Sequence, residues 1–247
     1  VTIRTVDDAT AATVELRTDP GNQQILAGFT TEMVGPTLTI AAPREGGIAD
    51  LASLWRARPR EGVAVMVTVP TGTATKIATS SASITVTGRC GGADITTGSG
   101  AIRLDHVDGD LLLSYASAES RTARVSGSVT VRSGSGDAQF GIIEGSLEHV
   151  CASGLLEVGE VRGAVRSRSG SGSTRLAAVY GDVDFASGSG AISIGLPAGA
   201  AAHLNVTTGS GHLRSELPIE DHPAPAKATI SVRARTGSGD VQLFRAA

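Results

Sequence analysis

Five arginines lie in one stretch of the chain and could together bind an anionic ligand. They are Arg121, Arg132, Arg166, Arg168 and Arg175. Guanidinium groups pair well with carboxylates and phosphates, so such a surface favours an anionic glycan or an acidic partner. The chain has 21 Lys and Arg against 24 Asp and Glu, a net charge of −3. The basic strip would therefore be local, and ordinary solvated arginines are the alternative interpretation.

Acidic residues at repeated spacing raise the question of catalysis, because glycoside-cleaving enzymes need paired carboxylates that flank the bond. Glu148, Arg166 and Asp184 follow one another at intervals of 18 residues, and Glu157 and Arg175 are spaced in the same way. Their alternating signs favour ladders of surface ion pairs, each worth about 0.3 kcal/mol. We therefore expect no catalytic residues and no enzymatic activity.

The histidines and cysteines lack the spacing of a metal site, so we expect no metal and no other cofactor. His149 falls at an inward position, where a packed histidine with a hydrogen-bonded neighbour is the simplest interpretation. Cys90 and Cys151 are more than three 18-residue repeats apart, too far for a disulfide. Free thiols favour a reducing compartment and hence a cytoplasmic location. A cell-surface or envelope location is the alternative, if an N-terminal segment was removed.

These residues belong to a repeat with a period of 18. In six consecutive repeats the third position of a Gly-Ser-Gly-like tetrapeptide is serine: Ser99, Ser117, Ser135, Ser153, Ser171 and Ser189. A second column is always glycine: Gly91, Gly109, Gly127, Gly145, Gly163 and Gly181. We interpret the glycines as corners, where a positive φ costs glycine nothing, and the serines as a ladder of hydroxyls at a tight turn.

Between these markers, apolar and polar residues alternate with a period of two, which is typical of β-strands. Ile102-Arg103-Leu104 and Val129-Thr130-Val131 are examples. A unit of this size cannot bury its apolar side alone, whereas stacked units share a continuous core. The sequence therefore predicts an all-β fold, a parallel β-solenoid of ~18-residue coils that rise about 4.8 Å each. Right-handed coiling is favoured over left-handed.

The period breaks twice near the C-terminus. From Ser189 to Ser210 is 21 residues, which implies a three-residue insertion, and from Ser210 to Ser238 is 28, which implies ten extra residues. The extra residues fall around the Pro-rich segment 219–227. If the terminal coil at Asp240–Phe244 is uncapped, it leaves a free strand edge there. Homo-oligomers through the solenoid ends, either head-to-tail or two-fold, are therefore a hypothesis.

Upstream of about residue 79 the 18-residue phase fades, although strands continue. The sequence predicts strands over 1–6, 12–17, 37–41 and 62–69. Residues 48–58, with Trp55, are compatible with a short helix or a packed loop. We expect residues 1–60 to form an irregular β segment that caps the solenoid, and residues 61–247 to form the solenoid repeats of one continuous domain.

Other solenoids and partners with this period or length are disfavoured. A calcium β-roll needs carboxylates in consecutive turns, and the position of Asp137 is held by Ala101 two repeats earlier. An acyltransferase-type solenoid needs an aliphatic residue at every sixth position, but Ser80 and Gly92 flank Val86 at that spacing. The net charge does not favour nucleic acid, and no apolar run reaches the ~18 residues of a membrane span.

A second corner motif, Val-x-Gly-x, recurs at Val107-Asp-Gly-Asp110, Val125-Ser-Gly-Ser128 and Val179-Tyr-Gly-Asp182. Together with the Gly-Ser-Gly corners and the apolar-x-apolar strands, this motif resembles the bacterial adhesin-like or toastrack-like β-strand-repeat domains. The resemblance is close over roughly residues 60–247 and loose over the first 60. It implies a β-solenoid of unknown specific role, associated with bacterial envelope or stress contexts, and it brings no catalytic residues.

We expect a non-enzymatic structural or interaction module whose long flat faces contact a protein or an envelope polymer. A glycan- or peptidoglycan-binding module is the first alternative. Aromatic residues make up 3% of the chain, which counts against it because sugars stack on aromatic rings. A polysaccharide-active β-helix enzyme is the second alternative, and it would require a cleft with convergent ionisable groups.

Overall fold

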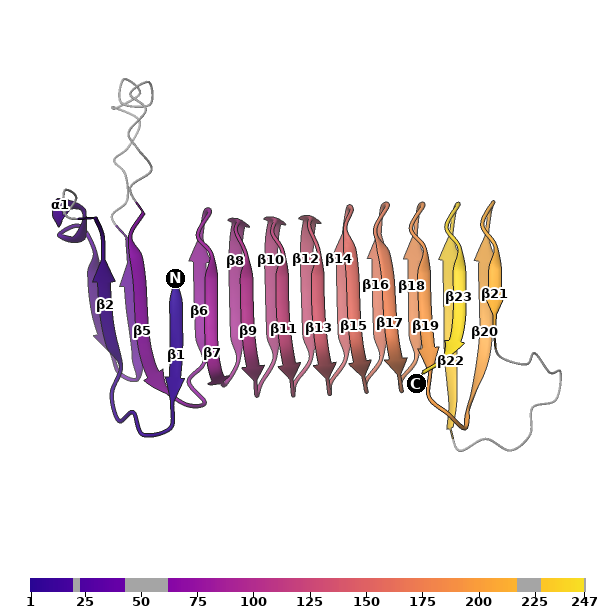
Figure 1. Cartoon of the computed structure of the whole chain (residues 1–247), viewed down its shortest axis with the longest axis horizontal. Coiled ribbons are helices and arrows are strands. Elements are labelled where there is room, and N and C mark those ends of the chain that lie inside the picture. The colour runs from indigo at the N-terminus through magenta and orange to yellow at the C-terminus, as the bar shows by residue number, and fades with distance from the viewer. Residues whose placement is uncertain (20–22, 43–61, 217–227, 247) are drawn as a thin grey trace, which may run out of the picture. The chain divides into compact units, whose positions relative to one another are not determined.

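The computed structural model describes residues 1–19, 23–42, 62–216 and 228–246. The segments 48–58, with Trp55, and 219–227, for which the sequence makes predictions, lie outside the described residues. The chain divides into two compact units, Val1–Pro70 and Thr71–Ala247, and each is described by itself (Figure 1).

The first unit is a small β structure. Its elements are β1 (Thr2–Val6), β2 (Thr13–Arg17), α1 (Gln23–Leu26), β3 (Thr30–Val34), β4 (Thr37–Ala41) and β5 (Ala64–Pro70). β5 pairs in parallel with β1 and antiparallel with β2, and β3 and β4 form an antiparallel pair. The four predicted strands are confirmed as β1, β2, β4 and β5. The sequence does not indicate β3, because all five of its side chains are exposed and no apolar alternation marks it.

The second unit consists of two sheets whose strands alternate along the chain. Sheet I has the order β6-β8-β10-β12-β14-β16-β18-β22-β20, and sheet II has the order β7-β9-β11-β13-β15-β17-β19-β23-β21. The strands of sheet I are β6 (Thr75–Thr79), β8 (Ala93–Ser99), β10 (Leu111–Ser117), β12 (Val129–Ser135), β14 (Leu147–Cys151), β16 (Val165–Ser169), β18 (Val183–Ser187), β20 (Ala200–Thr208) and β22 (Ala228–Thr236). The strands of sheet II are β7 (Ile84–Cys90), β9 (Ile102–Val107), β11 (Ser120–Val125), β13 (Ala138–Ile143), β15 (Leu155–Val161), β17 (Ser173–Val179), β19 (Ile192–Leu196), β21 (Leu213–Ser215) and β23 (Val241–Arg245). One strand of each sheet makes a coil, and the coils stack side by side (Figure 1).

Neighbouring coils are parallel, and from β6 to β19 they are in register with an offset of 18 residues. Leu111 pairs with Ala93 on one side and with Val129 on the other. The structure therefore confirms the all-β parallel solenoid with 18-residue coils. The handedness of the coil and the capping role of residues 1–60 stay predictions.

The core of this unit lies between the two sheets. Leu111, Val129 and Leu147 of sheet I are each 1% exposed, and Ile102 and Ile143 of sheet II are fully buried. Burying one such side chain contributes roughly 1.5–3 kcal/mol, and the repeat places comparable side chains in every coil. The stability of the stack therefore comes from many equivalent layers rather than from one central cluster.

The coils are not stacked in chain order at the C-terminal end. β22 lies between β18 and β20, and β23 lies between β19 and β21, so the last coil is inserted before the coil that precedes it in sequence. The sequential order assumed from the sequence is wrong here. The edge at Asp240–Phe244 is not free, because β23 is paired on both sides, and β20 and β21 are the last strands of their sheets. Association through the solenoid ends stays a prediction.

The core-facing side chains of the last two coils are of similar size in sheet I. Ile230 of the last coil is in register with the smaller Ala202, but Val232 and Ala234 are in register with the larger Leu204 and Val206. In sheet II, Leu243 of the last coil is in register with Ser215. The interior place of the last coil is seen in its burial: Ile230 is 2% exposed and Leu243 is fully buried, whereas Leu213 of the end coil is 43% exposed.

Polar contacts tie the inserted coil to its two neighbours. Oδ1 of Asp182 accepts the backbone N–H of Ser231 at 2.8 Å, and Oδ1 of Asp240 accepts that of His212 at 2.8 Å. The second of these bonds lowers the pKa of Asp240. Nη1 of Arg245 donates to the carbonyl oxygen of Ala200 at 3.0 Å, which holds the start of β20. The inserted coil is therefore held to both of its neighbours by side-chain hydrogen bonds.

The glycine column is required by close backbone approach. Gly109, Gly127, Gly145, Gly163 and Gly181 all have φ outside the left-handed region, which corrects the interpretation for this corner, whereas Gly100, Gly136 and Gly154 at the other corner have the expected positive φ. A Cβ added to any of them would collide with the carbonyl group of the glycine 18 residues earlier. The coils can therefore stack at this corner because each layer presents bare backbone to the next.

Candidate functional site

The structure divides the five predicted arginines between the two sheets. Arg132, Arg166 and Arg168 lie on β12 and β16 of sheet I, and Arg121 and Arg175 lie on β11 and β17 of sheet II. All five side chains are exposed. Because the core separates the sheets, their outer faces point away from each other. The five residues are therefore not brought together in one strip.

Arg166 belongs to a column of alternating charges. Glu148, Arg166, Asp184 and Arg233 occupy one register position on four successive strands of sheet I. Nε of Arg166 lies 3.7 Å from Oδ2 of Asp184. The predicted ion ladder is present at this pair, and the four residues together carry no net charge.

A second column of register-equivalent residues lies two residues further along the same strands. It contains arginines and no acidic residues. Its register runs from Arg132 through Val150, Arg168 and Ala186 to Arg235. We call Arg132, Arg168 and Arg235 the arginine row. All three are exposed, and none forms an ion pair with any acidic residue that the structure describes.

Arg235 enters this row because of the inserted coil. Stacking in chain order would have put Thr207 beside Ala186, whereas β22 places Arg235 there and Thr207 one strand further out. Reasoning from the sequence missed Arg235 for this reason. The core-facing residues of β20 and β22 are similar in size, so their pattern carries no signal for this order.

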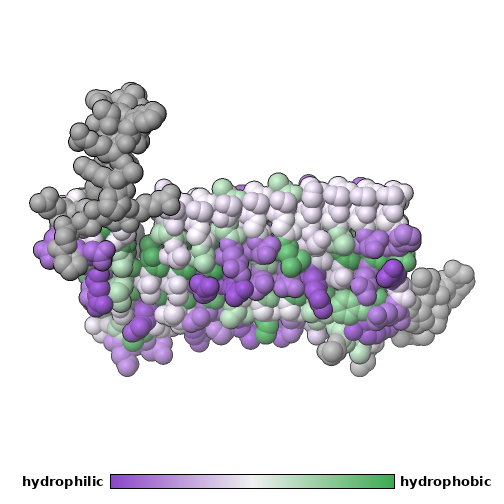
Figure 2. Space-filling view, turned by 45° about the horizontal axis from the view of Figure 1, so that its top comes forward, coloured by the Kyte–Doolittle hydropathy of each residue, from purple (hydrophilic) through white to green (hydrophobic). Residues whose placement is uncertain are grey.

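The arginine row is evenly spaced along the solenoid. Adjacent strands lie about 4.8 Å apart, so successive arginines are separated by about 9.6 Å at their Cα atoms. Val150, which is 41% exposed, and Ala186 lie between them. Arg168, Ala186 and Arg235 line a shallow, open depression of about 610 Å³. Figure 2 shows the small corner residues as a pale band along one edge of the stack, with charged and apolar side chains on the adjoining face.

Hydroxyl groups hold the corner next to the arginine row. Oγ of Ser169 donates to Oγ of Ser187 at 3.0 Å, and Oγ of Ser187 accepts the N–H of Gly190 at 2.8 Å. Oγ1 of Thr236 donates to the carbonyl oxygen of Gly190 at 3.3 Å. Ser169 and Thr236 directly follow Arg168 and Arg235 in the chain, and Ser187 follows Ala186 of the same column, so these bonds fix the backbone that carries these two arginines.

The serine column lies on the outside of the same corner. Ser99 is half-buried, and the other five members are exposed: Ser117, Ser135, Ser153, Ser171 and Ser189. The ladder of hydroxyl contacts is formed two positions earlier in the repeat, by Thr79 with Thr97 and by Ser169 with Ser187. The first position of the tetrapeptide is buried or half-buried beside the core, whereas the third is exposed in every coil except that of Ser99.

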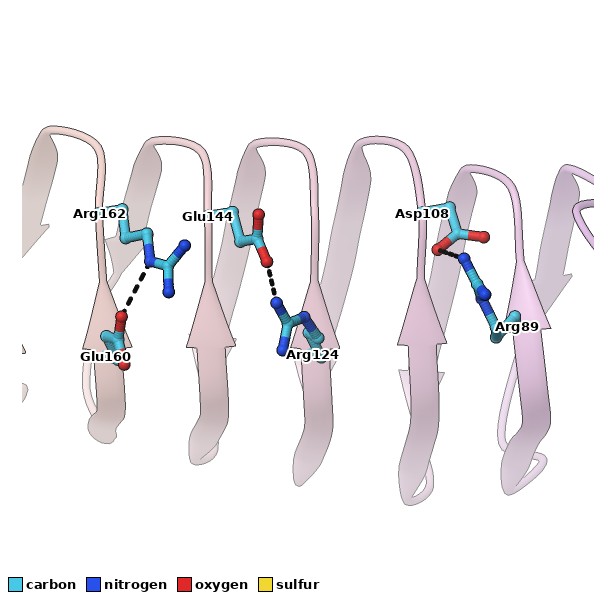
Figure 3. A network of polar contacts seen from close by, with 6 residues as sticks. All are labelled: Arg89, Asp108, Arg124, Glu144, Glu160 and Arg162. Atoms are coloured by element: carbon cyan, nitrogen blue, oxygen red, sulfur yellow. Dashed lines mark hydrogen bonds and ion pairs between the residues drawn. The ribbon is translucent and has the colours of Figure 1, made fainter.

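At the opposite corner of the coils, charged residues are paired (Figure 3). Nη2 of Arg89 lies 3.1 Å from Oδ1 of Asp108, and Arg124 is paired with Glu144. Arg121 of sheet II is likewise paired with Glu119. The arginine row differs from these positions because acids of neighbouring coils do not neutralise it.

The buried titratable groups have structural roles. His149 is 3% exposed, and its Nδ1 lies 3.2 Å from Oγ of Ser167, which confirms the predicted packed histidine. Burial lowers the pKa of His149 to about 4. Cys90 and Cys151 are free and buried, and burial raises the pKa of both thiols. Both thiols are therefore protonated at neutral pH and poorly nucleophilic.

Across the described ranges, no three His, Cys, Asp or Glu side chains are grouped so that they could hold a metal ion. In the same ranges no helix is long and apolar enough to cross a membrane. What the arginine row offers chemically is positive charge and N–H donors that can form charge-assisted hydrogen bonds with anions.

Comparison with known proteins identifies the family. The family model described as Toastrack DUF4097 matches residues 1–246. No curated protein and no solved structure matches the chain. Toastrack DUF4097 is a domain of unknown function and is not a known enzyme family. Because the match covers nearly the whole sequence, the chain belongs to the Toastrack DUF4097 family.

Proposed function

We propose that this protein is a non-enzymatic interaction module that binds an extended anionic partner along the outer face of sheet I. The observation that carries the proposal is the arginine row, in which Arg132, Arg168 and Arg235 stand in line without acidic partners among the described residues. The stacked backbone keeps their Cα atoms at a fixed spacing, so the row is preorganised for a ligand that runs along the solenoid axis.

The local charge is opposite in sign to that of the chain. The row carries three positive charges, the adjoining column of Glu148, Arg166, Asp184 and Arg233 sums to zero, and the chain has a net charge of −3. An exposed ion pair contributes roughly 0.2–1 kcal/mol, so one small anion would bind weakly. Useful affinity requires a ligand that contacts several arginines at once, and it will weaken as salt screens the charges.

The two alternative functions have less support. The depression beside the row is lined by no aromatic side chain from the described residues, which disfavours an uncharged glycan. A glycan-cleaving enzyme needs two carboxylates that flank a bond. Glu148 and Asp184 are separated by Arg166, which is ion-paired with Asp184. This column is therefore better suited to stabilising the surface than to catalysis.

The proposal predicts that anion binding weakens when positive charge is removed from the outer face of sheet I, and not when it is removed from the outer face of sheet II. Fluorescently labelled poly-L-glutamate is titrated with the native protein, with an Arg132→Gln/Arg168→Gln/Arg235→Gln variant and with an Arg103→Gln/Arg121→Gln/Arg175→Gln control. Each variant removes three positive charges, and the control residues are exposed on sheet II. We expect salt-sensitive binding by the native protein and the control, and a loss of about tenfold in the row variant.

Circular dichroism and thermal unfolding establish that all three proteins are folded to the same extent. Equal binding by the two variants would contradict the proposal, because attraction would then follow net charge rather than the row. Absence of binding by the native protein at low salt would also contradict it.

A further inference from the structure

We infer that the arginine row accepts an acidic peptide segment in the polyproline II conformation, with a carboxylate at every third residue. This inference rests on the proposed function and adds to it the class of ligand and the spacing of its charges.

The spacing of the row favours that conformation. Successive arginines are about 9.6 Å apart, because each interval spans two strands. A polyproline II chain has three residues per turn and rises about 3.1 Å per residue, so every third side chain returns to the same side after about 9.3 Å. Over the three arginines the two repeats diverge by about 0.6 Å, which the long arginine side chains can absorb.

Other peptide conformations match less well. An extended β-strand presents every second side chain to one side, at intervals of about 6.7 Å, so with one side chain at the first arginine its nearest side chain misses the second arginine by about 2.9 Å. An α-helix returns to one face after seven residues, or about 10.5 Å, and would diverge by about 1.8 Å. It also presents a wider cylinder to the flat sheet.

The surroundings of the row leave room for such a segment. Val150 and Ala186 lie between the arginines and are short, so a peptide backbone can approach the sheet there. The two intervening residues of each turn would lie to either side of the row. On one side they would meet the exposed corner glycines Gly170 and Gly188, and on the other side the ion-paired column at Arg166.

The chemistry of the row favours carboxylates on a peptide over the other anionic surfaces. Each guanidinium can bind one carboxylate through two parallel hydrogen bonds. An anionic bilayer attracts basic residues by about 1 kcal/mol each, and three arginines fall below the four to eight that are typical of lipid-binding clusters. An acidic glycan offers similar charge, but among the residues that the structure describes no aromatic ring on which a sugar could stack lines the depression at Ala186. A polyproline II segment is also partly ordered before binding, which reduces the entropic cost.

The test compares two labelled peptides of the same composition and charge, (Glu-Pro-Pro)₄ and Glu₄Pro₈. Both contain four glutamates, but only the first spaces them at every third residue. We expect the native protein to bind (Glu-Pro-Pro)₄ about fivefold more tightly, because the second peptide cannot engage all three arginines together. The preference should disappear in the arginine-row variant, whereas the sheet II control should keep it.

A second variant, Val150→Glu/Ala186→Glu, retains the arginines and gives them acidic neighbours in their own column. It should also lose the preference, so the test does not depend on the folding of one variant. Equal affinity for the two peptides overturns the inference, and if poly-L-glutamate binding still requires the row, the proposed function stands without it. Tighter row-dependent binding of heparin than of (Glu-Pro-Pro)₄ overturns the inference in favour of a glycan. If no anionic probe binds, both proposals fail.

Discussion

His149 occupies a core position that Leu113 and Val131 hold in the preceding coils, and its ring is bonded to a hydroxyl there. Oγ of Ser167 lies 3.2 Å from Nδ1 of His149 and 3.3 Å from Oγ1 of Thr174, so three buried polar groups satisfy one another between the sheets. Protonation of the imidazole would place a charge in this core, which is why burial holds the pKa of His149 near 4.

At the residue scale we therefore predict a loss of stability in acid that depends on His149. Its pKa is about 4 when folded, below the ordinary 6.5, so the unfolded chain binds the proton more readily. The contribution of the neutral, buried His149 to the free energy of unfolding is fully present above pH 6.5 and is lost as the pH falls toward 4. Between about pH 7.5 and 4.5 the free energy of unfolding should fall by about 2–3 kcal/mol from this group. Urea unfolding at the two pH values measures it.

The matched control is His149→Val, which copies Val131 of the preceding coil. Its stability should change less across the same pH interval, because other titrating groups are common to both proteins. The same pH dependence in the variant and the native protein would show that His149 is not responsible.

At the scale of the coil, the order of the last two coils can be tested by cross-linking. Ala186 and Arg235 are direct neighbours in sheet I, about 4.8 Å apart, within the range that a disulfide spans. Thr207 lies one strand beyond Arg235. We predict that Ala186→Cys/Arg235→Cys forms a disulfide on mild oxidation and that Ala186→Cys/Thr207→Cys does not, as read by mass spectrometry. The reverse result would support stacking in chain order.

Much of each coil could be predicted from the sequence. The 18-residue period gave the parallel register and the columns, because equivalent residues must meet equivalent neighbours in a stack. The order of the coils could not be predicted in this way. β22, which ends at Thr236, would pair with β20 in the same register whether it lay before or after β20 in the stack. Arg235 was therefore missed, and Arg121 and Arg175 were grouped with residues of the opposite sheet.

At the scale of the Thr71–Ala247 unit, stability should vary along the stack. Each coil contacts only its neighbours, and β20 is the last strand of sheet I, paired with β22 alone. We predict faster amide hydrogen exchange in β20 than in β22 or β18, because opening the end coil breaks one interface and opening an interior coil breaks two. Mass spectrometry after hydrogen exchange measures this, and equal protection of β20 and β22 would contradict it.

The inserted coil also bears on how the protein is made. A ribosome delivers residues 200–216 before residues 228–245, yet the later segment lies closer to the middle of the stack. Coils up to β19 can therefore be added as they emerge, in the order of translation. The segment that carries β20 and β21 cannot form its native pairs until β22 and β23, the strands with which it pairs, have been synthesised. The completion of this end, and with it the third arginine of the row, thus depends on the later synthesis of β22 and β23.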